Sequence, residues 1–543
     1  MEMKILDCTL RDGGYLTEKH FSENIIRGVI NGLTDAGIDY VEIGFLQDIS
    51  NSCENVVFHD SKDARKFIPN TRKNTLYTVL ADYSRYSATN LDRYDGQSFD
   101  VVRLCFLKNE RKDILVFANE ILTKGYKLFI QPVDILGYSD FELLDLIGDI
   151  NLIEADSFAI VDTFGSMYMD DLRTLFSIVH HNLNPKIAIN FHSHNNLQMS
   201  AALSQEFLNI SQNKRSVVVD STIFGIGRGA GNTPTELIVQ YINDKMNGNY
   251  NLDTILDLID GYIIGIKAQY RWGYDISMFL AGCFSSHVNN VDYLLEKPSL
   301  NSKDIRFILN SVAVAQRKRY DYDKLETMYL QYLKSDIDDT DTIKSLCNIM
   351  SDKNILVVAP GKSVNVEKET IQLFIKRHKP IVVSINFLPD TFSFDYVYFS
   401  NQHRYDFWKY DARLKKTKKI ITSNIHMTEK SDFTISFLRL VKSGWNNLDN
   451  SLIMLLRLLN ILSVKSIALA GFDGLFADGD SYYSKDFEIE TNQKEYLRKN
   501  AEIEEMFLNF LQNKKIKDVF FITRSKFEKT VGVSVIDFQK GEM

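Results

Sequence analysis

The chain has 543 residues, of which 45% are apolar and 25% are charged, a composition typical of globular proteins rather than disordered or fibrous ones. Two or three domains are expected at this length. The net charge of −8 provides no overall basic surface, so the sequence predicts no binding of nucleic acid.

Strand-like apolar runs recur through the first 222 residues, and each is followed by a helix-like segment. The runs are residues 4–7, 40–44, 76–81, 100–105, 127–133, 157–162, 187–192 and 217–222. A doubly wound sheet would show the same alternation, but it usually has fewer strands. Eight β–α units therefore favour an N-terminal TIM (β/α)8 barrel.

Polar side chains stand within or directly after these apolar runs. They are Arg11, Asp12, Glu42, Arg103, Gln131, Asp162, His192 and His194. Barrel enzymes build their active sites at the carboxyl ends of the strands, so we expect these side chains to converge on one mouth.

Two histidines, His192 and His194, lie at positions i and i+2 of a strand and face the same side. This pattern alone is also common in ordinary packing. Asp12 strengthens the metal interpretation, because one carboxylate and two imidazoles suit an octahedral ion such as Mn²⁺ or Mg²⁺ better than Zn²⁺. Asn232 can add a neutral oxygen as a further ligand.

Arg11 and Asp12 are followed by Gly13 and Gly14, which we expect to permit a sharp turn beside an oxyanion site. Glu42 lies in a buried run and needs a partner, for which Arg11 is the candidate. Arg103 also lies in a buried run and needs a partner. It can contact a substrate carboxylate or form a structural ion pair.

A glycine-rich loop, residues 225–231, follows the last predicted barrel strand. The Rossmann fingerprint would open a helix at the first crossover of a sheet, which is not where this loop lies. We expect the loop to approach a phosphate or carboxylate of the substrate. The candidate substrate-binding residues are Arg103, Gln131, Asp162 and Arg228.

The pattern after the barrel predicts three further segments. Residues 251–335 read as a helical extension that completes the site or forms a dimer surface, and the acidic stretch 336–352 reads as a linker. Strand-like runs at 354–359, 380–386, 396–400, 420–423, 466–470 and 519–523 predict a smaller, doubly wound Rossmann-like domain over residues 353–543.

The C-terminal domain shows a strand that runs into Pro360-Gly361-Lys362-Ser363. It is not a P-loop, because Leu356 stands where that motif requires its first glycine. A strand, a glycine turn and a helix can still bind phosphate at the helix N-terminus. A nucleotide or sugar-nucleotide site and a non-catalytic docking domain are the two interpretations.

The cysteines and the apolar segments are informative about the cellular compartment of the protein. Cys8, Cys53, Cys105, Cys283 and Cys347 are scattered and show no zinc-type pairing, which favours a reducing cytoplasm. No signal-peptide pattern follows Met1. Residues 451–472 are interrupted by charged and polar side chains, and they predict a buried helix followed by a strand instead of a membrane span.

Four ordered motifs resemble those of the DRE-TIM metallolyases, which include 4-hydroxy-2-oxovalerate aldolase and hydroxymethylglutaryl-CoA lyase. They are Thr9-Leu10-Arg11-Asp12-Gly13, the strand of Glu42, His192-x-His194 and Gly229-Ala230-Gly231-Asn232. The resemblance covers about residues 1–300, and residues 279–290 are most similar to the aldolase branch. It implies that Asp12, His192 and His194 are the metal ligands, with Asn232 as the candidate fourth ligand, and that Arg11 stabilises a metal-bound enolate of pyruvate.

Two positions depart from the hydroxyoxovalerate aldolases. This chain has Tyr15 where they carry a catalytic histidine, and Phe284 where they carry a tyrosine, with His287 close by. Either Tyr15 and His287 exchange the two proton-transfer roles, or the substrate differs. Tyr15 is equally well interpreted as a packing residue.

The resemblance predicts a divalent-metal-dependent aldolase that joins or cleaves a 2-keto acid, such as pyruvate, and an aldehyde that can be a sugar. Its predicted catalytic residues are Arg11, Tyr15, Glu42 and His287. An acyl-CoA condensing enzyme or lyase is one alternative, and a scaffold barrel serving a C-terminal transferase is another. The C-terminal part faintly resembles sialyltransferase-like nucleotide-sugar domains, and the aromatic helical segment leads us to expect a homodimer.

Overall fold

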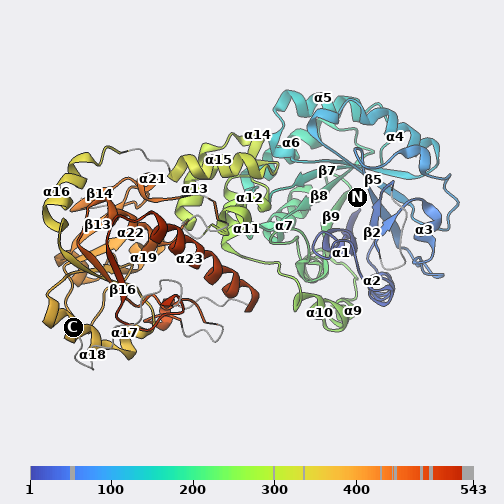
Figure 1. Ribbon diagram of the computed structural model, residues 1–543. Coiled ribbons are helices and arrows are strands. Elements are labelled where there is room, and N and C mark those ends of the chain that lie inside the picture. The colour runs from blue at the N-terminus through green and yellow to red at the C-terminus, as the bar shows by residue number, and fades with distance from the viewer. Residues whose placement is uncertain are drawn as a thin grey trace. The chain divides into compact units, whose positions relative to one another are not determined.

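The computed structural model describes residues 2–48, 55–297, 300–333, 337–427, 431–442, 444–445, 449–476, 481–487 and 493–528 (Figure 1). Cys53 lies outside these ranges. The chain divides into two compact units. The first consists of Met1–Asp292 and Ala313–Tyr320, and the second of Tyr293–Val312 and Asp321–Met543.

The first unit is a closed barrel of parallel strands. They are β1 (Met3–Asp7), β2 (Tyr40–Leu46), β4 (Leu76–Asp82), β5 (Val101–Phe106), β6 (Lys127–Pro132), β7 (Ser157–Asp162), β8 (Ala188–Ser193) and β9 (Val217–Ser221). The barrel closes because β1 pairs with both β9 and β2. The predicted TIM barrel and its eight strands are confirmed, while the short β3 (Val57–Phe58) beside β2 was not predicted.

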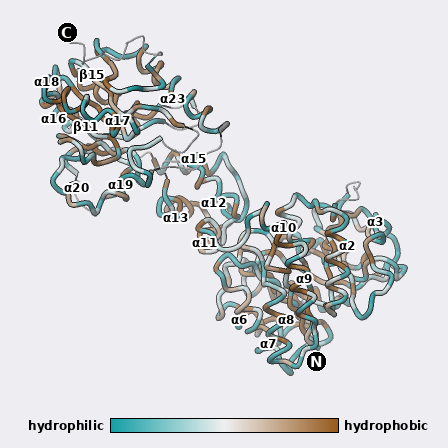
Figure 2. The backbone as a smooth tube through the Cα atoms, turned by 90° about the horizontal axis from the view of Figure 1, so that it is seen from below, coloured by the Kyte–Doolittle hydropathy of each residue, from teal (hydrophilic) through white to brown (hydrophobic). Residues whose placement is uncertain are grey.

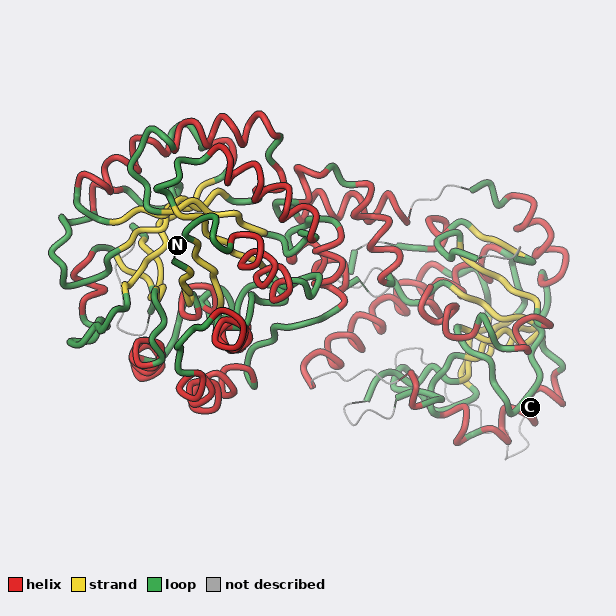
Figure 3. The backbone as a smooth tube through the Cα atoms, turned by 180° about the vertical axis from the view of Figure 1, so that it is seen from behind, coloured by secondary structure: helices red, strands yellow, loops and turns green. Residues whose placement is uncertain are grey.

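Helices surround the strands, as the red coils around the yellow strands in Figure 3 show. They are α1 (Thr9–Gly13), α2 (Glu23–Asp35), α3 (Ser61–Arg65), α4 (Ile114–Thr123), α5 (Asp140–Ile150), α6 (Met169–Asn182), α7 (Ser200–Ser211) and α8 (Thr235–Met246). Each longer helix turns an apolar stripe toward the sheet. In α2 that stripe is Ile26, Val29, Ile30 and Leu33, at the spacing of one helical face.

The interior of the barrel is layered because side chains alternate along a strand. One layer is apolar and contains Leu6, Tyr40, Val101, Phe129 and Val218. On β2, β5, β6 and β9 a buried polar side chain follows two residues after the apolar one. These polar residues are Glu42, Arg103, Gln131 and Asp220. A polar layer therefore lies above an apolar floor, on the side of the carboxyl ends of the strands.

The helices that follow the barrel are divided between the two units. The first unit contains α9 (Leu252–Leu258), the π-helical turn η5 (Ile259–Ile263), α10 (Ile264–Lys267), α11 (Ile276–Cys283) and α14 (Val314–Arg317). The second contains α13 (Ser302–Ser311) and α15 (Tyr322–Leu333), and α12 (Val288–Leu295) runs across the boundary. Within the segment predicted as a linker, the structure has helix α16 (Thr340–Met350).

The second unit contains a parallel sheet in the order β14-β13-β12-β11-β10-β15-β16. Its strands are β10 (Asn354–Val358), β11 (Ile381–Ile385), β12 (Tyr396–Phe399), β13 (Lys418–Thr422), β14 (Phe433–Ile435), β15 (Ser466–Ala470) and β16 (Asp518–Phe521). The apolar sequences of β11 and β15 are brown in Figure 2. The predicted Rossmann-like sheet is confirmed, although β14 was not predicted.

The remaining helices of the second unit connect these strands. They are α17 (Ser363–Val366), α18 (Lys368–His378), α19 (Gln402–Trp408), α20 (Ala412–Lys416), α21 (Phe437–Leu440), α22 (Ser451–Ile461) and α23 (Gln493–Asn513). The predicted buried helix and strand of residues 451–472 are α22 and β15. Within the described ranges, no helix is long and apolar enough to cross a lipid bilayer.

Candidate active site

Helix α1 places Arg11 and Asp12 at the carboxyl end of β1, where both side chains are buried. Neither Gly13 nor Gly14 has a positive φ angle, so the prediction that they permit a sharp turn is wrong. The glycines serve close packing instead. A Cβ atom on Gly13 would lie 3.0 Å from the side chain of Ile226, and one on Gly14 would lie 3.0 Å from two carbonyl oxygens of its own helix.

Glu42 is fully buried between two arginines. Its Oε2 accepts hydrogen bonds from Nε of Arg11 at 2.7 Å and from Nη1 of Arg103 at 2.8 Å. The predicted pair of Arg11 and Glu42 is confirmed. Arg103 has no exposed surface, and it also binds Asp220. The geometry therefore favours the structural ion pair for Arg103 over direct contact with a substrate.

Asp220, on β9, connects Arg103 to the histidines. Its carboxylate accepts hydrogen bonds from Nη2 of Arg103, from Nδ2 of Asn190 at 2.7 Å and from Nδ1 of His192 at 2.9 Å. This leaves Nε2 of His192 on the side of Asp12, 3.5 Å from its Oδ2. Asp220 thus fixes the orientation of the imidazole that the sequence indicated as a metal ligand.

These contacts close a ring of charged groups in the barrel mouth, because Oδ2 of Asp12 accepts a hydrogen bond from Nη1 of Arg11 at 2.7 Å. The members in order are Arg11, Glu42, Arg103, Asp220, His192 and Asp12. Two guanidinium cations face three carboxylates, so one negative charge remains when His192 is neutral. The ring therefore attracts a further cation at the position of Asp12 and His192.

Of the predicted metal ligands, Asp12 and His192 come within metal-binding distance of each other, in a group with Cys8, and His194 lies beside His192. The rings of His192 and His194 have centroids 5.1 Å apart and are nearly perpendicular. His194 forms an isolated β-bridge with Asn232, whose Oδ1 is buried and has no hydrogen-bond partner among the described residues. A Cβ atom on Gly227 would lie 2.1 Å from Nδ2 of Asn232 and 2.9 Å from Oδ1 of Asp12, so only glycine fits there.

The protonation states suit a metal site. Burial opposes ionisation of Asp12, but Arg11 and His194 outweigh it and hold the pKa of that carboxyl well below its usual value. Burial lowers the pKa of His194 to about 4, which keeps its imidazole neutral at pH 7. Burial also disfavours the charged form of His192, but hydrogen bonds to Asp12 and Asp220 raise its pKa.

The donor set fits a divalent ion. It combines one carboxylate, two imidazoles and the unpartnered amide oxygen of Asn232. A cation beside Nε2 of His192 takes the place of the proton that Asp12 and Asp220 otherwise favour. On these grounds Asp12, His192, His194 and Asn232 are the residues that would hold the metal.

Cys8 lies within this site although the sequence did not single it out. Its sulfur, an oxygen of Asp12 and a nitrogen of His192 are all within 4.8 Å of one another. Burial raises the pKa of the thiol well above its usual value, and Sγ donates a hydrogen bond to the carbonyl oxygen of Ser221 at 3.3 Å. Without a bound cation Cys8 is therefore a buried thiol beside Asp12 and His192, and a cation at this place would favour its thiolate form.

Tyr15, Arg228 and His287 meet at the rim. The backbone N–H of Arg228 donates to Oδ1 of Asp12 at 3.1 Å, and its guanidinium lies 5.7 Å from the centre of the Tyr15 ring. The same guanidinium contacts Nε2 of His287. Tyr15 is 41% exposed and packs edge-on against Phe45. Arg228 of the glycine-rich loop therefore contacts both candidate proton-transfer residues and the candidate metal-binding carboxylate.

The two rim groups differ in proton affinity. Tyr15 as a whole is 41% exposed, but desolvation by the surrounding groups raises the pKa of its hydroxyl to about 12, so the hydroxyl keeps its proton at neutral pH. Burial, assisted by the positive charge of Arg228, lowers the pKa of His287 to about 4. Nδ1 of His287 accepts from the backbone N–H of Asn289 at 3.2 Å. At neutral pH, Tyr15 can donate a proton, whereas both ring nitrogens of His287 face N–H donors, so His287 can accept a proton only at Nε2 after the Arg228 guanidinium moves aside.

Gln131 and Asp162 lie deeper than the rim. Gln131 receives a hydrogen bond from Arg103 and donates one to Asn190, both at 3.1 Å. Asp162 is buried and accepts hydrogen bonds from the backbone N–H groups of Ser166 and Met167. Burial raises the pKa of Asp162 to about 7. Both residues support the walls of the mouth, and their predicted contact with substrate stays a prediction.

Asp220 and Asn190 were missed by the sequence analysis. The signal was present, because Asp220 is an acid in the apolar run Val217-Val218-Val219 and needs a buried partner, as Glu42 does. Asn190 precedes His192 by two residues and therefore faces the same side of β8.

The sequence of the barrel is similar to those of several known proteins. A family model described as HMGL-like matches residues 112–260. The oxaloacetate decarboxylase of Mycobacterium tuberculosis is 25% identical over 284 residues, which are 50% of this chain and 79% of that protein. The 4-hydroxy-2-oxovalerate aldolase of Carboxydothermus hydrogenoformans is 28% identical over 320 residues, which are 56% of this chain and 90% of that one.

Among solved structures, the N-terminal domain of a proposed aldolase from Bacteroides vulgatus is similar to this chain, with a TM-score of 0.47 and 24% identity. The match covers 54% of this chain and 96% of that domain.

Proposed function

The barrel belongs to the DRE-TIM metallolyase superfamily, and from this premise we propose that the protein is a divalent-metal-dependent carbon–carbon lyase acting on a 2-keto acid. The finer proposal is an aldolase that joins or cleaves the bond between a pyruvate enolate and an aldehyde. The reactions that give the two relatives their names have this chemistry in common. Oxaloacetate on loss of CO2, and 4-hydroxy-2-oxovalerate on retro-aldol cleavage, both release the enolate of pyruvate.

One observation carries the proposal: the charged ring presents Arg11 directly beside the candidate metal ligands. Nε and Nη1 of Arg11 are held by Glu42 and Asp12, while Nη2 has no hydrogen-bond partner within the described ranges. That remaining donor is rigidly placed for a substrate oxygen that gains negative charge as the enolate forms. Asp12, His192, His194 and Asn232 would hold a divalent ion, which would supply Lewis-acid polarisation of the 2-keto acid.

The proton transfers are assigned to the rim. In the cleavage direction, the Arg228 guanidinium moves off Nε2 of neutral His287, which then accepts the proton of the substrate hydroxyl as the carbon–carbon bond breaks. The Tyr15 hydroxyl donates a proton to the methylene carbon of the enolate, which gives the methyl group of pyruvate. The proton held by His287 then returns through solvent to the Tyr15 oxygen, so both groups regain their starting protonation states. Arg228, between the two side chains, holds them over Asp12. The reverse sequence makes the bond, and the two residues exchange roles.

The test measures pyruvate release by the full chain from oxaloacetate and from a series of 4-hydroxy-2-keto acids. Protein stripped with a chelator is compared with protein reloaded with Mn²⁺ or Mg²⁺. We expect metal-dependent release from at least one of these substrates and its loss in Asp12→Asn. Equal release before and after metal loading would contradict the proposed chemistry, and the series identifies the aldehyde.

A further inference from the structure

The sequence predicts two binding places for an anionic group, the start of α17 and the glycine-rich loop 225–231. The first prediction is wrong. The carboxylate of Asp473 accepts hydrogen bonds from the backbone N–H and the hydroxyl of Ser363, both at 2.6 Å. An internal acid therefore takes the place that a phosphate at the start of α17 would need.

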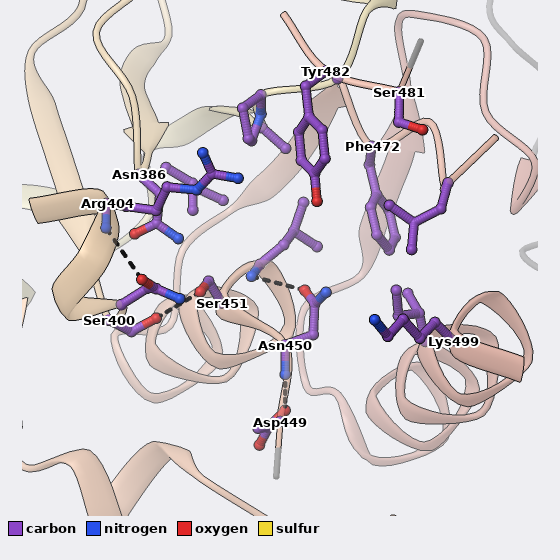
Figure 4. Close-up of a pocket in the computed structure, with 18 of the residues that line it drawn as sticks. Asn386, Ser400, Arg404, Asp449, Asn450, Ser451, Phe472, Ser481, Tyr482 and Lys499 are labelled. Carbon is purple, nitrogen blue, oxygen red and sulfur yellow. Dashed lines mark hydrogen bonds between the residues drawn. The ribbon is translucent and has the colours of Figure 1, made fainter. Parts of the chain in front are cut away.

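The cavity beside Asp473, in the second unit, does not favour an anion either. Its volume is about 730 Å³, and it is lined by three acids and three cationic side chains, which are Asp449, Asp473, Asp486, Lys297, Arg404 and Lys499. Lys297 and Lys499 are already paired with glutamates. Arg404 and Lys499 lie on opposite sides of the cavity (Figure 4). The glycine-rich loop of the barrel remains.

The backbone of this loop is fixed on both sides of Arg228. The backbone N–H of Arg228 donates to Oδ1 of Asp12 at 3.1 Å, and that of Ala230 donates to Oδ1 of Asn196 at 2.9 Å. Gly229 has a φ angle of +67°, and a Cβ atom on it would lie 2.7 Å from the same amide oxygen. Arg228 is nevertheless exposed between buried neighbours. Its side chain is therefore free to change conformation while the backbone stays in place.

The guanidinium of Arg228 has no anionic partner. Within the described ranges it forms no ion pair, and its partners are Nε2 of His287 and the ring of Tyr15. By contrast, the buried Arg11 and Arg103 are both held by carboxylates. Burial lowers the pKa of His287 and the charge of Arg228 lowers it further, while no carboxylate of the described residues raises it. A cation without a counter-charge thus stands at the rim of the mouth.

A neutral imidazole is a poor partner for a guanidinium. A carboxylate or a phosphate offers the opposite charge and two parallel N–H···O bonds, neither of which the imidazole provides. An anionic group within reach of Arg228 therefore competes successfully with His287 for the guanidinium. When the guanidinium leaves, Nε2 of His287 becomes accessible.

The contact at Nε2 indicates which part of a substrate carries this anionic group. In the mechanism proposed above, Arg11 and the candidate metal ligands act on the 2-keto acid half. Nε2 of His287 accepts the proton of the hydroxyl group on the aldehyde half, and Arg228 contacts that same nitrogen. The group that draws Arg228 away therefore lies on the aldehyde half, close to the carbon that bears the hydroxyl.

The turn that carries His287 has a second guanidinium beside it. The carbonyl oxygen of Arg317 accepts a hydrogen bond from the backbone N–H of His287 at 2.8 Å, and its guanidinium lies 5.3 Å from the centre of the Phe284 ring. Asp134, an acid that contacts the same segment, is paired with Lys318. Two guanidinium groups therefore contact this turn, which suits a negatively charged substrate group.

We propose that Arg228 selects aldehydes that carry a carboxylate or a phosphate, an inference that rests on the proposed function. In the empty site its guanidinium covers Nε2 of His287. The anionic group of the aldehyde half binds the guanidinium and draws it off, and the freed Nε2 exchanges the hydroxyl proton with the substrate. A neutral aldehyde lacks this group and leaves Nε2 covered. Arg228 is thus a specificity-determining residue.

The first test observes His287 without turnover. NMR of the full chain, labelled with 15N in its histidines and loaded with Mg²⁺, follows the ring nitrogens of His287, which are assigned by comparison with His287→Gln. Matched aldehydes are added without a keto acid: glyoxylate and acetaldehyde, succinic semialdehyde and butyraldehyde, and glyceraldehyde 3-phosphate and glyceraldehyde. We expect the acidic member of at least one pair to shift the Nε2 signal, and its neutral partner to leave it in place. The responding pair distinguishes a carboxylate from a phosphate.

The second test measures bond formation between pyruvate and the same aldehydes. We expect kcat/KM for the acidic member of the responding pair to exceed that for its neutral partner at least tenfold. Arg228→Ala keeps the backbone N–H bond to Asp12, but the ratio should fall below about threefold and the Nε2 signal should no longer respond. Arg93→Ala, at an exposed arginine before β5, should retain both the ratio and the response.

The lyase proposal and the proposal for Arg228 fail in different ways. An Arg228-dependent response of Nε2, without bond formation from pyruvate and any aldehyde, would contradict the lyase and leave Arg228 as an anion-binding residue. The proposal for Arg228 would be overturned if no acidic aldehyde gave an Arg228-dependent response. An unchanged selectivity in Arg228→Ala, shown to be folded by thermal unfolding, would overturn it as well.

Discussion

Nδ1 of His192 donates to Asp220 at 2.9 Å, and this hydrogen bond turns Nε2 of the same ring toward Asp12. A carboxylate behind a ligating histidine fixes its tautomer and orientation. Asp220 thereby couples the candidate metal site to Arg103 and Glu42, deeper in the barrel. The metal site and the ion pairs under it act as one unit.

Replacing Asp220 with asparagine should weaken Mn²⁺ binding by about 10- to 100-fold, because His192 loses its orienting carboxylate. Titration of the chelator-treated variant with Mn²⁺ measures this. Asp257→Asn, at an exposed aspartate of α9, should bind Mn²⁺ as the unaltered protein does. Unchanged affinity in a folded Asp220→Asn protein would show that Asp220 does not position the ligand.

Glu42→Gln should be strongly destabilising, since it leaves two buried guanidinium groups without their shared carboxylate. Removing one partner from a buried ion pair typically costs about 3 to 5 kcal/mol. Urea unfolding, followed by circular dichroism, measures the free energy of unfolding. The exposed Glu154→Gln is the matched control, and a loss below about 1 kcal/mol for Glu42→Gln would contradict the charged ring as a structural element.

Tyr15→Phe separates catalysis from packing. The ring and its edge-on contact with Phe45 remain, but the hydroxyl is removed. We expect kcat to fall by about 100-fold or more with an unchanged unfolding temperature, as for loss of a general acid. Tyr168→Phe, in an exposed position, should alter neither quantity. Full activity of Tyr15→Phe would establish the packing interpretation.

The pH dependence of kcat should reflect His287. Its pKa is lowered to about 4, from an ordinary value of about 6.5, so its neutral form persists through pH 6. We expect the acid limb of the rate profile to lie below pH 6. A fall in rate centred near pH 6.5 would show that His287 is not the proton acceptor, or that its pKa is not lowered.

The same histidine contributes to acid sensitivity. Between pH 6.5 and 4 the unfolded chain binds a proton at His287 that the folded protein does not, so stability falls as the pH falls through this window. His287→Gln should reduce that slope, whereas His20→Gln, at an exposed histidine, should not. Urea unfolding at several pH values provides the comparison.

The barrel was predictable because its strands are short apolar runs at regular spacing, and polar side chains at their ends identified the mouth. Asp12, His192 and His194 were found through residue type and the two-residue period of a strand. The i and i+2 spacing was sufficient because His192 lies on β8 and His194 follows directly after the last residue of that strand.

Side-chain contacts between strands that are distant in the sequence were harder to predict. The Arg11–Glu42 pair followed from the rule that a buried acid needs a partner, but the same rule was not applied to Asp220. Arg103 has three strong partners that come from different strands, so the sequence could not separate a structural role from substrate binding. The predicted reason for Gly13 and Gly14 was also wrong, because Gly13 is limited by the distant side chain of Ile226 and Gly14 by carbonyl oxygens of its own helix.

The most direct test of the lyase proposal is the exchange of pyruvate methyl protons for deuterium, followed by NMR in D2O. Enolate formation alone causes this exchange, so the aldehyde partner need not be known. The account predicts exchange with Mn²⁺ or Mg²⁺ that is lost on chelation and in His192→Ala, but retained in His20→Ala. No exchange with either metal, or exchange at an unchanged rate in folded His192→Ala, would contradict it.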